Sequence, residues 1–111
     1  MFSFLKRLGG PQIDLAELDA LLARGAVRVL DVREETEFRS GHLRGAINIP
    51  VKQLPDRIGR LKHDKPYAVI CQSGTRSKSA TSYLLDQGFE GTVSVTGGTG
   101  AWVRSGRPIV Q

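Results

Sequence analysis

The sequence is short of the residues that stabilise small secreted or metal-dependent domains. It holds one cysteine, Cys71, and two histidines among 111 residues. A single cysteine cannot form an internal disulfide, so a disulfide scaffold is excluded, and a reducing compartment, the cytoplasm, is expected. No Cys-x-x-Cys pair and no His/Cys cluster with ligand spacing is present. These absences argue against a thioredoxin-type dithiol and give no support to a metal site.

Long apolar runs and aromatic residues are also scarce. No apolar run approaches the length that spans a bilayer, so no transmembrane segment is expected. Basic and acidic residues balance at eight each through Asp56, whereas from Arg57 onward eight basic residues stand against three acidic ones. This excess favours an anionic substrate or an acidic partner, with an ordinary solvated surface as the alternative. Nucleic acid is disfavoured, because the basic residues are scattered and few aromatics lie among them.

The chain length predicts one domain with one hydrophobic core. The first ten residues, MFSFLKRLGG, lack the charge order, long apolar core and cleavage site of a signal peptide. We expect residues 1–12 to be a short leader that is frayed or packed on the surface, with an interfacial anchor as the lesser alternative. Residues 13–111 are expected to form the single domain. The sequence leaves the oligomeric state open.

Strand-like and helix-like segments alternate along this domain. Asp14 and Glu17 have the spacing of a capping box, and Gly25 ends the helix that they begin. Strands are expected over 27–32, 46–50, 67–71 and 92–95, and further helices over 34–41, 51–61 and 77–87, with a turn and short helix over 97–102 and an irregular or edge-strand tail from 106. Pro55 and Gly59 weaken the helix over 51–61. The alternation predicts an α/β fold, a parallel sheet with helices on both faces.

Cys71 lies where the clearest buried strand turns into a helix. Ligands bind at this carboxyl edge of a parallel sheet. Free N–H groups at the helix start and the positive φ that Gly74 permits favour an anion-binding turn around the sulfur. The loop residues that would bind substrate are Gln72, Ser73, Gly74, Thr75, Arg76 and Ser77. A thiol so placed ionises below the free value of about 8.5, so we interpret Cys71 as reactive rather than as a small core residue.

The spacing between Cys71 and Arg76 bears on the group transferred. Cysteine phosphatases place five residues between their cysteine and arginine, and here only Gln72 to Thr75 intervene. A tighter ring leaves less room for phosphate and suits a smaller group, such as a single sulfane sulfur. Ile70 also stands where a phosphatase often has histidine. A phosphatase or arsenate reductase on the same fold is therefore the weaker alternative.

Three segments in order resemble the rhodanese family of single-domain sulfurtransferases. They are DVREETEFRSGHLRGAINIP (31–50), CQSGTRS (71–77) and TGGTGAW (96–102). The resemblance spans roughly residues 13–110 and implies a rhodanese-like parallel sheet. One such segment would be weak evidence, whereas three with matching order and spacing are strong.

The resemblance implies a thiosulfate sulfurtransferase with Cys71 as the nucleophile. The Cys71 thiolate would take a sulfane sulfur from a small anionic donor such as thiosulfate and pass it, as a persulfide, to a thiol or cyanide acceptor. Arg76 would orient the oxyanion of the donor, and no metal or organic cofactor is needed. The alternative is a low-turnover sulfur carrier or regulatory module that docks an acidic acceptor protein.

Other polar residues have structural explanations of differing strength. Asp31 ends a strand and is expected to accept hydrogen bonds from neighbouring loops, and Arg33 either pairs with a nearby glutamate or lines the mouth of the site. We expect His42 to make a structural hydrogen bond and His63 to lie on a solvated loop. The glycines of GGTG lack the lysine and spacing of a nucleotide loop and are interpreted as a packed turn, with Trp102 in the core.

Overall fold

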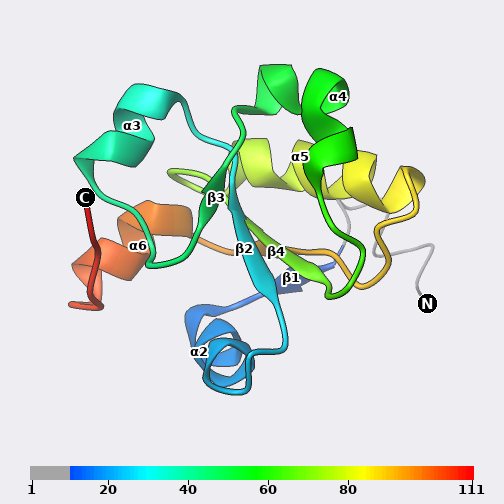
Figure 1. Cartoon of the computed structure of the whole chain (residues 1–111). Coiled ribbons are helices and arrows are strands. Elements are labelled where there is room, and N and C mark those ends of the chain that lie inside the picture. The colour runs from blue at the N-terminus through cyan, green and yellow to red at the C-terminus, as the bar shows by residue number, and fades with distance from the viewer. Residues whose placement is uncertain (1–10) are drawn as a thin grey trace.

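The computed structural model describes residues 11–111 and contains a five-stranded parallel sheet (Figure 1). The strands are β1 (Gln12–Ile13), β2 (Arg28–Asp31), β3 (Ile47–Asn48), β4 (Tyr67–Ile70) and β5 (Val93–Val95). Their order in the sheet is β1-β5-β4-β2-β3, and every adjacent pair is parallel. β4, which leads into Cys71, is therefore the central strand. This sheet confirms the predicted α/β class.

Helices cover both faces of the sheet, also as predicted (Figure 1). They are α2 (Leu15–Ala23), α3 (Glu35–Ser40), α4 (Leu54–Arg57) with the 3-10 turns η1 (Val51–Gln53) and η2 (Ile58–Arg60) on either side, α5 (Thr75–Asp86) and α6 (Gly98–Arg104). Alternate residues of β4 point to opposite faces. Val69 packs in the cluster that contains Leu54 of α4 and Leu84 of α5. Ala68 packs in the cluster that contains Leu18 of α2 and Trp102 of α6.

Local sequence signals predicted the start of α2 correctly but misplaced other helix ends. The Glu17 N–H donates to Asp14 Oδ1 at 2.8 Å and the Asp14 N–H donates to Glu17 Oε1 at 3.0 Å, which confirms the capping box. α2 ends at Ala23 with Arg24 as its C-cap, and Gly25, the predicted C-cap, follows with φ +62°. The helix expected over 51–61 is instead broken into η1, α4 and η2, with Pro55 in the first turn of α4 and Gly59 within η2. α5 begins at Thr75, two residues before the predicted start at Ser77.

Both ends of the described chain pack against the domain. β1 was not expected as a strand: Gln12 and Ile13 pair with Ser94 and Val95, so residue 12, assigned above to the leader, belongs to the sheet. Of the other residues in that predicted leader, 1–10 lie outside the described residues. At the other end, Val110 makes an isolated antiparallel bridge with His42. None of the helices in residues 11–111 is long and apolar enough to cross a membrane.

Candidate active site

The loop from Cys71 to Arg76 lies at the carboxyl edge of the sheet, between β4 and α5. Gly74 is the N-cap of α5 and has φ +103°, which confirms the positive φ expected there. A Cβ at Gly74 would lie 3.3 Å from the Gly97 nitrogen. Both the dihedral angle and this close approach favour glycine. The turn therefore needs Gly74 to bring the following N–H groups back over Cys71.

Backbone N–H groups converge on the sulfur of Cys71. The Gly74 N–H donates to Sγ at 3.1 Å and the Ser77 N–H donates at 3.3 Å. Ser77 Oγ lies 3.5 Å from Sγ, 3.1 Å from the Gly74 carbonyl oxygen and 2.8 Å from Ser94 Oγ. These donors belong to the first turn of α5, a 12-residue helix whose positive dipole end faces the sulfur. The arrangement stabilises negative charge on Sγ.

The pKa of Cys71 is set by two opposing influences. Burial is the largest single one and raises the pKa of the thiol. Hydrogen bonds from the Ser77 hydroxyl, then from the N–H groups of Ser77, Gly74 and Ser73, lower it and together outweigh burial. The pKa of Cys71 consequently lies below its ordinary value. The direction is the one that the sequence predicted, a thiol that ionises more readily than a free one.

The sulfur is covered in this conformation. Cys71 and Ser77 both have an exposed fraction of 0%, while Gln72, Ser73 and Thr75 form an exposed rim. The sequence analysis placed Ser77 among the substrate-binding residues, but its side chain is buried, with Oγ 3.5 Å from the sulfur. The burial of Cys71 was not foreseen either.

Arg76 is paired with a residue that the sequence analysis did not single out. Its Nη1 and Nη2 donate to the two carboxylate oxygens of Glu37 on α3, at 2.8 and 3.0 Å. The hydrogen bond from Arg76 is the main reason why the pKa of Glu37 falls to about 2. Glu37 also accepts from the Glu34 N–H and so caps α3. The guanidinium predicted to bind the donor is thus already engaged by a carboxylate, although its Nε–H and one N–H on each Nη remain.

Asp31 and Arg33 form a buried ion pair beside the loop. Arg33 Nη2 donates to Asp31 Oδ2 at 2.8 Å and its Nε donates to Oδ1 at 3.0 Å, with the two residues only 0% and 3% exposed. Arg33 further donates to the Gly41 carbonyl oxygen at 2.8 Å and to Gln72 Oε1 at 3.3 Å. Of the two alternatives for Arg33, pairing with a nearby glutamate is wrong. The partner is Asp31, the last residue of β2, whose buried carboxylate accepts from the Arg33 side chain.

The glycine motif that begins α6 packs directly against the loop backbone. The Thr99 N–H donates to the Cys71 carbonyl oxygen at 2.8 Å, and the Gly100 N–H donates to the Gln72 carbonyl oxygen at 2.9 Å. A Cβ at Gly98 would lie 2.2 Å from the Cys71 oxygen, so a side chain cannot fit there. The interpretation as a packed turn is confirmed. Trp102, 6% exposed, donates from Nε1 to the Pro108 carbonyl oxygen at 2.8 Å.

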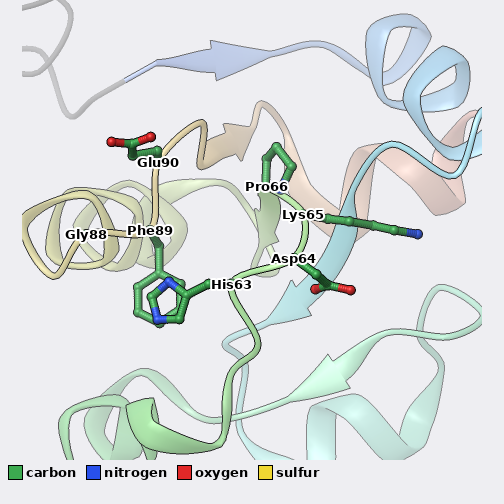
Figure 2. A pocket seen from close by; sticks show the side chains of 7 residues that line it. All are labelled: His63, Asp64, Lys65, Pro66, Gly88, Phe89 and Glu90. Atoms are coloured by element: carbon green, nitrogen blue, oxygen red, sulfur yellow. The ribbon is translucent and has the colours of Figure 1, made fainter.

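Neither histidine contacts the loop. His42 Nδ1 is 2.8 Å from the Phe38 carbonyl oxygen and its ring stacks on Phe38, which agrees with a structural role. His63 is exposed and stacks on Phe89 at 4.0 Å. Figure 2 shows this pair beside a hollow lined by residues that precede β4 and follow α5. That hollow lies at the edge of the sheet where β4 begins, opposite Cys71, and is separate from the site.

Comparison with known proteins agrees with the loop geometry. The family model for the rhodanese-like domain matches residues 14–105. The chain is 38% identical over 77 residues to the thiosulfate sulfurtransferase GlpE of Shewanella oneidensis, covering 69% of this chain and 76% of the relative. It is 34% identical over 100 residues to a sulfurtransferase of Allochromatium vinosum, covering 89% and 94%.

A solved structure of a rhodanese-related protein has the same fold as this chain. The rhodanese-related protein of Thermoplasma volcanium superimposes with a TM-score of 0.82 and 39% identity, over 90% of this chain and 97% of that one. The segment that the family model matches, residues 14–105, includes the cysteine loop. The chain therefore belongs to the rhodanese-like domain family.

Proposed function

We propose that this protein is a sulfurtransferase that moves a sulfane sulfur from a small anionic donor, such as thiosulfate, to a thiol or cyanide through a persulfide on Cys71. The observation that carries the proposal is the pair of N–H groups, from Gly74 and Ser77, aimed at Sγ. A structural core cysteine needs no such donors. Relatives named as sulfurtransferases support the same reaction class.

The first half-reaction is a displacement at sulfur. The Cys71 thiolate attacks the outer sulfur of thiosulfate and forms an S–S bond to it. The S–S bond of thiosulfate breaks, and sulfite leaves with the electron pair of that bond. The products are an anionic Cys71 persulfide and sulfite, so charge and electrons balance. The N–H groups that hold the thiolate then stabilise the persulfide, because they are already oriented toward this point.

The second half-reaction returns the thiolate. A nucleophile such as cyanide attacks the outer persulfide sulfur, takes it as thiocyanate and leaves the electron pair of the S–S bond on Cys71. The chain has no second cysteine, so no internal disulfide can release the sulfur. The acceptor is consequently a separate molecule. The exposed residues Gln72, Ser73 and Thr75 surround its approach, and Arg76 lies beside them with part of its positive charge offset by Glu37.

A second function is favoured by the complete burial of Cys71. If opening of the rim is infrequent, the domain acts as a low-turnover sulfur carrier or regulatory module rather than as a fast enzyme. The excess of basic residues after Asp56 then fits an acidic acceptor protein, which would dock and open the loop. Such a role in the reducing cytoplasm is compatible with the single free thiol.

Steady-state turnover of thiosulfate and cyanide tests the proposal. We expect thiocyanate formation by the wild-type protein and none by Cys71→Ser, whereas activity that survives in Cys71→Ser would overturn the assignment. Weak wild-type turnover that rises with an acidic protein acceptor would favour the carrier. An aryl phosphate assay separates the phosphatase alternative, since Cys71-dependent phosphate release comparable to sulfur transfer would reverse the ranking.

A further inference from the structure

Ser94 places a hydroxyl group in the middle of the buried strand β5. Its neighbours Val93 and Val95 pack with the cluster that contains residues of α2 and α6, so Ser94, which alternates with them, points toward the face covered by α5. Ser94 is 1% exposed, and its Oγ lies 2.8 Å from Ser77 Oγ. Within residues 11–111 this is the one hydrogen bond of the Ser94 side chain. Because burial of a hydroxyl costs free energy unless a hydrogen bond compensates it, the contact with Ser77 accounts for a serine at this position.

The direction of this hydrogen bond follows from a count of the protons around Ser77. The Ser77 hydroxyl has one proton and two lone pairs. Besides Ser94, it contacts the Gly74 carbonyl oxygen at 3.1 Å and the Cys71 sulfur at 3.5 Å. A carbonyl oxygen and a thiolate only accept, so the single Ser77 proton goes to one of them. The proton between the two serines then comes from Ser94, which donates to Ser77.

Ionisation of Cys71 changes the partner of the Ser77 proton. In the neutral state the S–H group donates to Ser77 Oγ while Ser77 donates to the Gly74 carbonyl oxygen. When the thiol loses its proton to solvent, the sulfur becomes an acceptor and the Ser77 O–H turns toward it. The Gly74 carbonyl is not left unpaired, because the carbonyl of an N-cap residue also accepts the first N–H of the helix. Ser94 donates to Ser77 in both states, and a hydroxyl that accepts a hydrogen bond is itself a stronger donor.

We propose that Ser94 is a positioning residue that holds and polarises the Ser77 hydroxyl as a donor to the Cys71 thiolate. Ser94 makes no hydrogen bond to the sulfur, so it acts through Ser77. The thiolate is the nucleophile of the first half-reaction and the leaving group of the second. The role of Ser94 in sulfur transfer therefore rests on the proposed function, whereas its effect on the thiolate is measured without any turnover.

The charged groups around the loop stay unchanged when Ser94 is replaced. They are Arg76 of α5 with its partner Glu37 of α3, and the buried pair of Asp31 and Arg33. β5 and the first turn of α6 carry no charged side chain. A shift in the titration of the thiol in Ser94→Ala consequently reports the loss of a hydroxyl and not the loss of a charge.

The pH profile of iodoacetamide alkylation tests the inference, with Thr81→Val as a matched control. Thr81 lies one turn after Ser77 in α5, is 0% exposed, and its Oγ1 has no hydrogen-bond partner in the described chain. Each substitution removes one buried hydroxyl, and only that of Ser94 contacts Ser77. We expect Ser94→Ala to raise the alkylation midpoint by about 0.3–0.6 pH units and Thr81→Val to leave it unchanged. An unmoved midpoint in Ser94→Ala, or an equal rise in Thr81→Val, would overturn the inference.

A double variant tests whether Ser94 acts through Ser77. Once Ser77→Ala has removed the hydroxyl that Ser94 polarises, adding Ser94→Ala should not move the alkylation midpoint further. Equal midpoints for Ser77→Ala and Ser77→Ala/Ser94→Ala support the indirect role. A further rise in the double variant, equal to the rise that Ser94→Ala causes alone, would reject it.

Sulfur transfer gives a reading that separates this inference from the proposed reaction. Below the alkylation midpoint, a shift of this size lowers the thiolate fraction about two- to fourfold. The kcat/KM of Ser94→Ala for thiosulfate should fall by the same factor there and approach the wild-type value well above the midpoint. A fall that persists unchanged at high pH would contradict the role of Ser94. If the wild-type protein shows no turnover, the proposed function fails, while the alkylation profiles still decide the role of Ser94.

Discussion

The buried ion pair of Asp31 and Arg33 allows a quantitative prediction for Asp31→Asn. The Asp31 carboxylate accepts from the Arg33 backbone N–H at 3.0 Å and from Nε and Nη2 of the same residue at 3.0 and 2.8 Å. Asparagine removes the negative charge and can turn amide donors toward the guanidinium. The positive charge of Arg33, whose side chain is only 4% exposed, would then be buried without a counter-charge.

Removal of one partner from a buried pair costs about 3–5 kcal/mol, because the remaining charge stays desolvated. A domain of this length has a free energy of unfolding of about 5–15 kcal/mol, so Asp31→Asn should lose a large share of it. Urea unfolding followed by circular dichroism measures the loss as a lower midpoint at an unchanged slope. The exposed pair Arg28–Asp64 supplies the control, since Asp64→Asn should shift the midpoint only slightly.

A double variant tests the physical reason. Adding Arg33→Met to Asp31→Asn removes the uncompensated charge and should recover part of the lost stability, because an apolar side chain of similar length costs nothing to desolvate. The reasoning fails if Asp31→Asn is no less stable than Asp64→Asn. It also fails if the double variant is less stable than Asp31→Asn alone.

Three further predictions address the loop and its supports. Iodoacetamide alkylation of Cys71 should have a pH midpoint below that of a free thiol. Ser77→Ala should raise that midpoint, because the Ser77 hydroxyl makes the largest pKa-lowering hydrogen bond, and an unmoved midpoint would refute this role. Glu37→Gln keeps an acceptor for the cap of α3 but removes the negative charge that pairs with Arg76. The KM for thiosulfate should then fall about two- to fivefold. A rise in KM would contradict the idea that the Glu37 carboxylate and the donor compete for Arg76. Gly98→Ala should lower the free energy of unfolding by more than about 2 kcal/mol, because its Cβ would clash with the Cys71 oxygen. Gly88→Ala, with φ +90° and no atom near its Cβ, should lower it by only about 1 kcal/mol, from backbone strain alone. Equal losses in the two variants would refute the clash.

Features that depend on neighbouring residues could be predicted from the sequence. The cap formed by Asp14 and Glu17 is a contact between residues three positions apart. Gly74 could be predicted because its own turn needs a positive φ, which glycine permits. The alternation of apolar strands with helices fixed the class of the sheet and placed Cys71 at its carboxyl edge. The donors around Sγ follow from the same local turn, which is why the chemistry of the cysteine could be inferred early.

Features that depend on residues far apart in the sequence could not be predicted. β1 has only two residues and becomes a strand by pairing with β5, more than 80 positions along the chain. Glu37 meets Arg76 across 39 positions, and no signal near either residue selects that partner. The backbone of α6 reaches the loop because Gly98 and Gly100 carry no side chain where the helix meets Cys71 and Gln72. The complete burial of Cys71 likewise results from packing between elements.

The most direct test of the persulfide is the intact mass of the protein after incubation with thiosulfate and removal of excess donor. We predict a gain of one sulfur atom, which disappears when cyanide is added and never forms in Cys71→Ser. No added mass on the wild-type protein, or the same added mass on Cys71→Ser, would contradict the claim that the amides of this loop hold a sulfur-carrying cysteine.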